Sequence, residues 1–263
     1  MKKILTIAGS DPSGGAGIQA DLKTITVHKM YGMSVITALT AQNTTGVFGI
    51  SEVSPEFVSL QLDCVFRDIR PDAVKIGMLP DADIVRAVAD GLRKYEAENI
   101  VVDPVMAATS GGKLMRDHTA ESLVQDLLPL TGIVTPNIPE AETLCGMMIR
   151  TPEDMEKAAR QIAAMIPGGA CTVLIKGGHL AETADDFLLD GDTSRWFAGR
   201  RIFTDNTHGT GCTLSSAIAC RLAEGRSTEE SVLLAKEYVT DAISAGLDLG
   251  KGNGPLDHIC RIR

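Results

Sequence analysis

The sequence predicts an α/β fold with a mostly parallel central sheet and helices on both of its faces. Short apolar runs alternate with amphipathic stretches along most of the chain, and two of those stretches begin with a capping residue followed by proline. This alternation is the order expected of successive βαβ units. The 263 residues show no linker, repeat or low-complexity segment. We therefore expect a single domain spanning residues 1–263.

The first unit reads as a strand, a glycine-rich turn and a helix. Residues 3–8 form a short apolar run that ends in glycine, and residues 16–30 carry apolar side chains at roughly helical spacing. Further strands are expected at residues 34–41, 73–76, 100–102, 132–135 and 172–175, and further helices at residues 55–66, 81–92, 118–127 and 152–165.

The last third of the chain departs from this rhythm. Two apolar segments, residues 187–189 and 195–197, flank Asp190-Gly191-Asp192, which predicts an antiparallel hairpin at one edge of the sheet. Two helices should close the chain, one from Cys212 and one from Ser227, where a glutamate three residues later gives the spacing of a capping box.

Composition excludes several classes of protein. The net charge of -9 without a basic tract disfavours nucleic acid and anionic membranes as partners. No apolar stretch approaches the length of a membrane span, and the first apolar run is too short for a signal peptide. The six cysteines form no C-x-x-C pair, so neither a zinc site nor a disulfide framework is indicated. We expect a cytoplasmic enzyme acting on a small molecule.

The stretch from Asp205 to Thr213 is glycine-rich and leads into a segment with apolar residues at helical spacing. Such a boundary binds anions, because backbone N–H groups and the helix dipole point out of the first turn. Gly209 and Gly211 lack a Cβ and so let a phosphate approach the backbone. Cys212 follows them, at the positive N-terminal end of the expected helix. The alternative is an ordinary turn followed by a buried apolar cysteine.

The sequence contains neither of two common nucleotide-binding motifs in its usual context. Residues 15–20 formally match G-x-G-x-x-A, but six residues separate the first strand from that glycine, and the second strand ends without an acid for a ribose. The sequence also contains no P-loop motif. At residues 11–15, a substrate cradle and a flexible turn remain open alternatives.

Charged residues follow three of the expected strands. Asp103 ends one strand, Glu140 lies shortly after another, and Lys176 follows a third. Since the carboxyl ends of strands face one crevice in such folds, the two acids could hold Mg²⁺ and its waters against a polyphosphate, with Lys176 neutralising phosphate charge. The alternatives are loop or helix-capping acids and a solvated lysine. We expect His179 and His208 to be structural.

Taken together, these motifs closely resemble the bacterial hydroxymethylpyrimidine/phosphomethylpyrimidine kinases of thiamine biosynthesis, in the ribokinase superfamily. The first and last motifs, AGSDPSGGAGIQADLKT at residues 8–24 and NTHGTGC at residues 206–212, are the most specific. The others lie at residues 41–44, 75–79, 103–106, 135–140 and 176–179.

The resemblance implies a ribokinase-like three-layer α/β/α sandwich and a homodimer. It also implies ATP with Mg²⁺, and phosphorylation of 4-amino-5-hydroxymethyl-2-methylpyrimidine and then of its monophosphate. By position, Gln42 would read the pyrimidine within a pocket lined by Ala16, Asp21, Met78 and Val105. The nucleotide phosphates and metal would be served by Asp103, Asn137, Glu140, Lys176 and Thr207, and the anion hole would be formed by Gly209, Gly211 and Cys212.

Cys212 stands where ordinary ribokinase relatives carry aspartate. A cysteine must become a thiolate before it can accept a proton, and we expect the helix N-terminus to favour that form. Some pyridoxal kinases share this cysteine, so a pyridoxal or dual-specificity kinase is the nearest alternative; a nucleotide- or pyrimidine-binding protein without turnover is the alternative of another class. Residues 107–112 differ from the commoner lysine-containing version of this loop, which leaves its phosphate contacts open.

Overall fold

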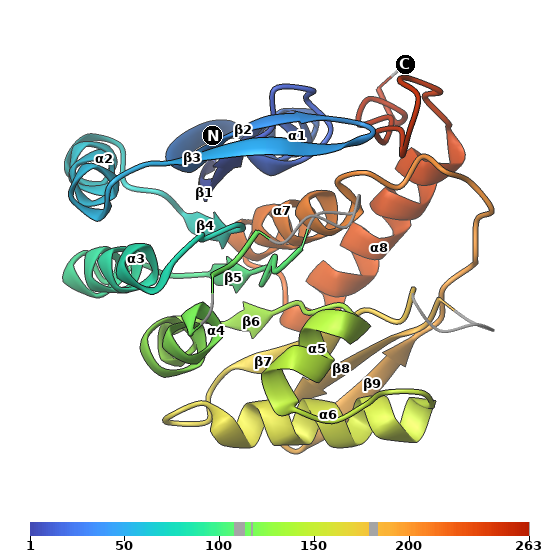
Figure 1. The fold of residues 1–263 in the computed structure, drawn as a ribbon. Coiled ribbons are helices and arrows are strands. Elements are labelled where there is room, and N and C mark those ends of the chain that lie inside the picture. The colour runs from blue at the N-terminus through green and yellow to red at the C-terminus, as the bar shows by residue number, and fades with distance from the viewer. Residues whose placement is uncertain (108–113, 117, 179–183, 263) are drawn as a thin grey trace.

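The computed structural model of the chain describes residues 1–107, 114–116, 118–178 and 184–262 (Figure 1). Within them, one sheet has the strand order β3-β2-β1-β4-β5-β6-β7-β8-β9. The strands are β1 (Lys3–Ser10), β2 (Tyr31–Asn43), β3 (Gly46–Glu52), β4 (Ala73–Ile76), β5 (Ile100–Val102), β6 (Ile133–Val134), β7 (Thr172–Ile175), β8 (Asp186–Asp190) and β9 (Thr193–Phe197). The six strands from β2 to β7 in this order are parallel, and β3, β8 and β9 pair antiparallel at the edges. The predicted mostly parallel sheet and edge hairpin are confirmed.

Helices cover both faces of the sheet, which confirms the three layers (Figure 1). The helices are α1 (Gly17–Val27), α2 (Pro55–Asp68), α3 (Ala82–Lys94), α4 (Thr119–Ser122), α5 (Ile138–Cys145), α6 (Pro152–Met165), α7 (Thr210–Ala223) and α8 (Thr228–Ser244). One core cluster packs α2, α3, α5 and α6 against one face of the sheet, and a second packs α1, α7 and α8 against the other. Along β5, β6, β7 and β8, neighbouring apolar residues belong to opposite clusters, as the pleat requires.

The predicted capping residues begin their helices as expected. Ser54 accepts a hydrogen bond from the Phe57 N–H before α2, and Ser227 accepts one from the Glu230 N–H before α8. Thr151 and Asp154 form a reciprocal capping box at α6. Each of these side chains satisfies a backbone donor that the first turn leaves unpaired.

Several elements differ from the prediction. β3 is not predicted from the sequence, because its apolar Phe48 and Ile50 are exposed and the segment lacks the pattern of a buried strand. α5 is not predicted either, since it is short and contains proline. α7 begins at Thr210 rather than at Cys212. The expected helix at residues 118–127 is one turn of α4 followed by a π-helical turn, Leu123–Leu127.

Candidate active site

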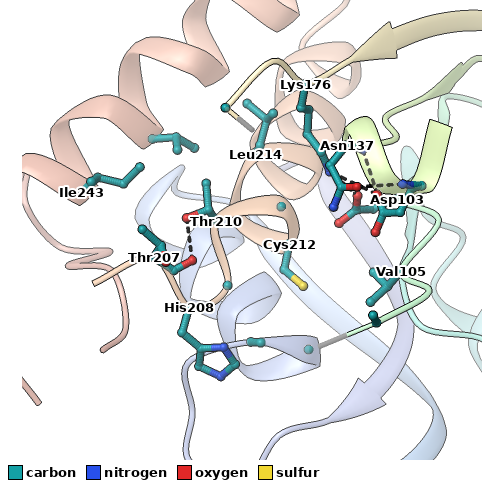
Figure 2. Close-up of a pocket in the computed structure, with 18 of the residues that line it drawn as sticks. Asp103, Val105, Asn137, Lys176, Thr207, His208, Thr210, Cys212, Leu214 and Ile243 are labelled. Atoms are coloured by element: carbon teal, nitrogen blue, oxygen red, sulfur yellow. Dashed lines mark hydrogen bonds and ion pairs between the residues drawn. The ribbon is translucent and has the colours of Figure 1, made fainter. Parts of the chain in front are cut away.

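A cavity of about 1020 Å³ lies where the parallel strands end, the usual ligand position in open α/β sheets (Figure 2). Its size lies at the upper end of the range for small-molecule sites. Every residue that the sequence predicts for the site lines this cavity, except Asp21. These residues are Ala16, Gln42, Met78, Asp103, Val105, Asn137, Glu140, Lys176, Thr207, Gly209, Gly211 and Cys212.

The N-terminus of α7 forms one wall of the cavity. Gly209 has φ +84°, in the left-handed region, and a Cβ there would overlap the Gly15 carbonyl group. A Cβ on Gly211 would lie 2.9 Å from an Asp103 carboxylate oxygen and 3.2 Å from Lys176 Nζ. Glycine at both positions therefore brings the first turn of α7 against these charged groups, and its N–H groups and dipole can bind an anion.

A hydrogen bond joins the N-terminal glycine-rich loop to the loop before α7. His208 Nε2 lies 2.8 Å from Asp11 Oδ2, and both side chains are buried. Asp11 also accepts hydrogen bonds from Ser13 and from the Ala16 N–H. Burial raises the pKa of Asp11, but the hydrogen bonds from His208 and Ser13 outweigh it and lower that pKa overall. Residues 11–16 thus form an internally bonded turn beside the cavity, and the role of His208 here is structural.

Lys176 and two acids meet at the floor of the cavity. Lys176 Nζ lies 2.7 Å from Asp103 Oδ1 and 4.0 Å from Glu140 Oε2. Glu140 also caps α5, because its carboxylate accepts a hydrogen bond from the Asn137 N–H while Asn137 Oδ1 accepts one from the Glu140 N–H. The helix-capping alternative is therefore realised, yet the same carboxylate faces the cavity. Asn137 is held in place by this reciprocal cap.

The two acids fit a magnesium site of the kind that phosphate substrates complete. Burial raises the pKa of Glu140 to about 7; Lys176 lowers it and Asp103 raises it. Among the described residues, no group of three or more His, Cys, Asp or Glu side chains could hold a metal ion. Mg²⁺ commonly keeps several waters and binds through one or two carboxylates together with substrate phosphates, so a pair of acids is sufficient.

Cys212 does not have the charge state expected from the sequence. Burial raises the pKa of its thiol to about 11; Lys75 lowers it, Asp21 and Asp103 raise it, and a hydrogen bond from the Gly17 N–H lowers it. The expectation that the helix N-terminus favours the thiolate is wrong for the free protein, because loss of solvent outweighs the positive end of α7.

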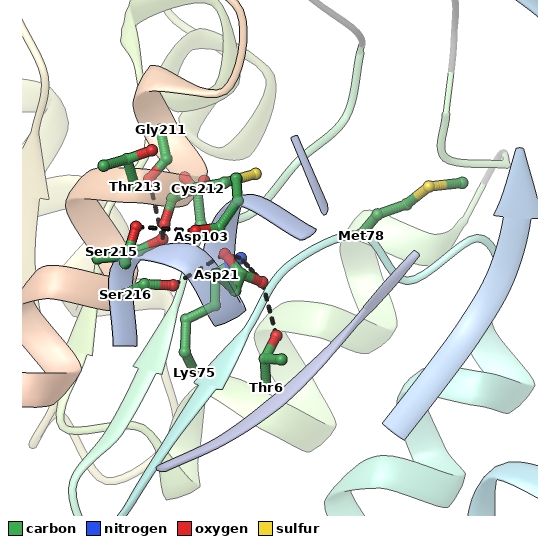
Figure 3. Close-up of polar contacts among 12 residues, drawn as sticks. Thr6, Asp21, Lys75, Met78, Asp103, Gly211, Cys212, Thr213, Ser215 and Ser216 are labelled. Atoms are coloured by element: carbon green, nitrogen blue, oxygen red, sulfur yellow. Dashed lines mark hydrogen bonds and ion pairs between the residues drawn. The ribbon is translucent and has the colours of Figure 1, made fainter. Parts of the chain in front are cut away.

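Asp21 does not line the cavity, contrary to the expectation from the resemblance. Its side chain is fully buried beneath the start of α7, where both carboxylate oxygens lie 2.9 Å from Lys75 Nζ (Figure 3). Lys75 was not identified as a site residue from the sequence. The available signal was a lysine within the otherwise apolar segment of β4, Ala73–Ile76.

The far end of the cavity is lined by residues that the sequence did not indicate. Leu214 on α7 and Val239 and Ile243 on α8 supply apolar surface there (Figure 2). Lys236 Nζ lies 2.5 Å from Asp186 Oδ2 and donates to the Ala184 carbonyl group. The apolar residues could not be recognised, because their helical spacing is the same as that of core residues.

Two sequence expectations fall outside the described residues: the phosphate contacts of positions 108–112, and His179. In the part of the chain that the structure describes, no helix combines the length and apolar character needed to cross a membrane.

Comparison with known proteins identifies relatives along nearly the whole chain. The family model described as phosphomethylpyrimidine kinase matches residues 11–257. A hydroxymethylpyrimidine/phosphomethylpyrimidine kinase of Rhizobium meliloti is 51% identical over 98% of this chain and 97% of its own length. The thiamine biosynthesis bifunctional protein ThiED of Geobacter sulfurreducens is also 51% identical, over 97% of this chain, which spans only 52% of that longer protein.

A solved structure shares the fold of this chain. The pyridoxal kinase of Staphylococcus aureus in complex with AMP-PCP and pyridoxal superposes with a TM-score of 0.91 at 36% identity, covering 100% of this chain and 95% of that one. That protein therefore binds AMP-PCP and pyridoxal within the same fold.

Proposed function

This chain belongs to the phosphomethylpyrimidine kinase family and is a phosphotransferase, and from that premise we propose that it phosphorylates 4-amino-5-hydroxymethyl-2-methylpyrimidine with ATP. A second transfer to the monophosphate yields the diphosphate used in thiamine biosynthesis. The observation that carries this proposal is one cavity with three chemically distinct parts: a heterocycle end, a central anion-binding turn and an apolar far end. One domain, residues 1–263, performs both steps.

The heterocycle end matches an aminopyrimidine in size and polarity. Met78, Val105 and Ala16 offer small or apolar surface to the ring. The amide of Gln42 carries both a donor and an acceptor, the pattern required by a ring nitrogen beside an exocyclic amino group. Its Oε1 lies 3.1 Å from Thr40 Oγ1, whose single proton can be donated either to Gln42 or to the Ser10 carbonyl group.

The centre of the cavity supplies the charge that phosphoryl transfer needs. The N–H groups around Gly209, Gly211 and Cys212 face the position of the transferred group, and Lys176 adds a cation. Asp103 and Glu140 are the residues that would hold Mg²⁺, and the ion would supply positive charge to neutralise the phosphates. Asn137 and Thr207 contact the nucleotide phosphates.

The apolar far end takes the adenine ring of ATP. Leu214, Val239 and Ile243 provide a surface against which a purine can pack. Ile243 and Val105 lie on opposite sides of the start of α7 (Figure 2), so we place the nucleotide and the heterocycle on opposite sides of the anion-binding turn.

Pyridoxal is the second candidate substrate. It is supported by the similarity to the pyridoxal kinase of Staphylococcus aureus, because pyridoxal also presents a hydroxymethyl group on a nitrogen heterocycle. A binding protein without turnover is disfavoured, since membership of a kinase family is accompanied here by Lys176 and both acids in one cavity.

The protein acts in the cytoplasm as a homodimer. All six cysteines are free thiols, as expected in a reducing compartment. Several large apolar side chains of the β2–β3 hairpin and of α2 are exposed: Leu39, Phe48, Ile50, Phe57 and Leu60. Exposed apolar surface is typical of protein contacts, and a second copy of the chain is the partner that we infer.

The activity is tested by incubating the protein with ATP, Mg²⁺ and the hydroxymethylpyrimidine and identifying products by mass spectrometry. We expect the monophosphate first and the diphosphate later. A parallel reaction with pyridoxal measures the second candidate. If the protein phosphorylates neither the hydroxymethylpyrimidine nor pyridoxal, the proposal is wrong.

A further inference from the structure

A fully buried ion pair lies beneath the anion-binding turn (Figure 3). Lys75 on β4 and Asp21 on α1 are both 0% exposed, and Lys75 Nζ is 2.9 Å from each carboxylate oxygen of Asp21. Neither residue lines the cavity. The pair therefore acts on a bound ligand only through other groups.

Asp21 joins the pair to two further elements. Its carboxylate accepts hydrogen bonds from Thr6 Oγ1 on β1, at 2.6 Å, and from Ser216 Oγ on α7, at 2.8 Å. Ser216 lies one helical turn after Cys212, so the pair contacts α7 directly below its first turn. The carboxylate is thus held by three side chains from three elements.

The Lys75 ammonium group has little freedom to move. A Cβ on Gly77 would lie 2.8 Å from Lys75 Nζ and 3.1 Å from the Cβ of Ala8, so the space between β4 and β1 is closed around the charge. Burial lowers the pKa of Lys75, but Asp21, Cys212 and Asp103 together raise it above its usual value. The lysine therefore remains charged.

Stability alone does not account for this arrangement. Two buried charges lose their hydration, and an apolar pair of equal volume is often as stable or more stable. The two charges also act unequally on Cys212: after burial, the lowering effect of Lys75 on the thiol pKa is the largest influence, ahead of the opposing effect of Asp21. The Lys75 charge therefore acts on the thiol more strongly than the Asp21 charge does, and the pair contacts α7 through the hydrogen bond between Asp21 and Ser216.

We propose that the Lys75–Asp21 pair is a positioning device for phosphoryl transfer, which fixes a positive charge behind Cys212 and so supports negative charge at the start of α7. The charged groups around this sulfur are then Lys75, Asp21 and Asp103, with Lys176 close enough to be influenced by it. The catalytic part of the inference rests on the proposed kinase function. The charge at the sulfur can be measured without substrate.

The test is the alkylation rate of Cys212 by iodoacetamide at pH 8.5 in a metal-free buffer. Mass spectrometry of the Cys212 peptide separates this reaction from that of the exposed Cys64. Below the thiol pKa the rate follows the thiolate fraction. We expect Lys75→Met to slow alkylation about tenfold, the effect of one pKa unit, and Asp21→Asn to accelerate it.

The opposite directions distinguish a charge effect from damage to the fold, which would change both variants alike. Thr6→Val is the matched control: it removes a hydrogen bond to Asp21 without altering charge and should leave the rate within about twofold. Changes in the same direction, or no change in either charge variant, would overturn the inference. If Lys75→Met does not fold, the other two variants still test the inference. It is supported if alkylation of Cys212 is faster in Asp21→Asn but unchanged in Thr6→Val.

The kinase assay supplies the second measurement. We expect Lys75→Met to lower kcat while leaving KM for the heterocycle unchanged, because the pair does not touch the heterocycle end. If the unmodified protein has no kinase activity, the proposed function is wrong. The effect of Lys75 and Asp21 on Cys212 would still be shown if the two variants change the alkylation rate as expected.

Discussion

The Lys176 ammonium group lies 2.7 Å from the Asp103 carboxylate, although 73 positions separate the two residues in the sequence. Each charge neutralises the other within the protein alone. Neither charge is therefore buried without a partner in the protein alone, which avoids the cost of an uncompensated buried charge. Under the proposed function, Lys176 would contact a phosphate and Asp103 would help to hold the metal ion.

We expect Lys176→Ala and Glu140→Ala to slow transfer by about 10²–10³ while affecting heterocycle binding little. Both side chains act on charge at the phosphates, where electrostatic stabilisation supplies most of the catalysis. Steady-state kinetics and calorimetric titration of the unphosphorylated pyrimidine measure the two effects separately. Gln42→Ala is the control with the opposite pattern, a raised KM. Equal losses of pyrimidine affinity in the first two variants would contradict the placement.

Cys212→Ala tests whether the thiol accepts the substrate proton. Because the thiol pKa is raised to about 11, the thiolate fraction grows about tenfold per pH unit up to that value. The first phosphorylation should therefore accelerate as the pH rises from 7 towards 10. Cys212→Ala should remove this rise and lower the rate by about 10²–10⁴, the usual worth of a general base.

The second phosphorylation is the internal control for Cys212. Its nucleophile is a phosphate oxygen, which is already largely deprotonated near neutral pH, so the loss in Cys212→Ala should be smaller. Equal slowing of both steps, or of neither, would show that only the backbone of the turn is catalytic.

Gly209→Ala should abolish activity. It should also lower the free energy of unfolding by more than the cost of placing alanine at a positive φ. A Cβ at Gly209 would overlap the Gly15 carbonyl group. Gly225→Ala is the matched control, because Gly225 has nearly the same φ, +83°, and a Cβ added there would meet no atom within 4 Å. It should cost only about 1–2 kcal/mol. Urea denaturation of both variants gives the difference, and equal losses would contradict a close approach of the two loops.

His258 should make the protein less stable in mild acid. Burial, followed by repulsion from Lys23, lowers its pKa to about 4. Between pH 4 and its ordinary value near 6.5, the unfolded chain binds the proton and the folded chain does not, so the free energy of unfolding rises with pH across this window. The contribution is about 3 kcal/mol at most.

His258→Gln should flatten that dependence while retaining an acceptor or donor for Thr213 Oγ1, which lies 3.1 Å from His258 Nε2. Urea titrations at pH 4.5 and pH 7 measure the slope. His28, whose pKa is also lowered by burial, leaves a residual slope in the variant. An unchanged slope would show that His258 binds its proton equally well in the folded and unfolded states.

The dimer is tested by Phe48→Ser in β3. Phe48 is 71% exposed, so this change removes apolar surface without opening a core cavity. Analytical ultracentrifugation should find a dimer for the unmodified chain and a monomer for the variant. Met148→Ser, at an exposed site in the loop after α5, is the control that should remain dimeric.

The sequence was sufficient to predict the charged and glycine-rich part of the cavity lining, because the position of a residue relative to a strand or helix end limits where it can lie. Polar residues that follow parallel strands must meet at one edge of the sheet, and Asp103 and Lys176 do so. Gly209 and Gly211 were also recognisable, since a glycine-rich stretch before a helix is typical of anion sites, although an ordinary turn was the alternative.

Burial is the quantity that the sequence could not supply. Asp21 has the same neighbours in sequence whether it faces the cavity or the core, and only the packing of β1, β4 and α7 around it decides between them. The pKa of Cys212 depends in the same way on atoms from several elements. β3 was missed for the converse reason, since its apolar residues are left exposed.

The hydrogen bond between Asp11 and His208 spans 197 positions, and this distance bears on how the protein is made. During synthesis Asp11 emerges early, but His208 emerges only after about four fifths of the chain. Until then Asp11 lacks this hydrogen-bond partner. Contacts between residues so far apart in sequence raise the contact order of a fold, which is associated with slower folding.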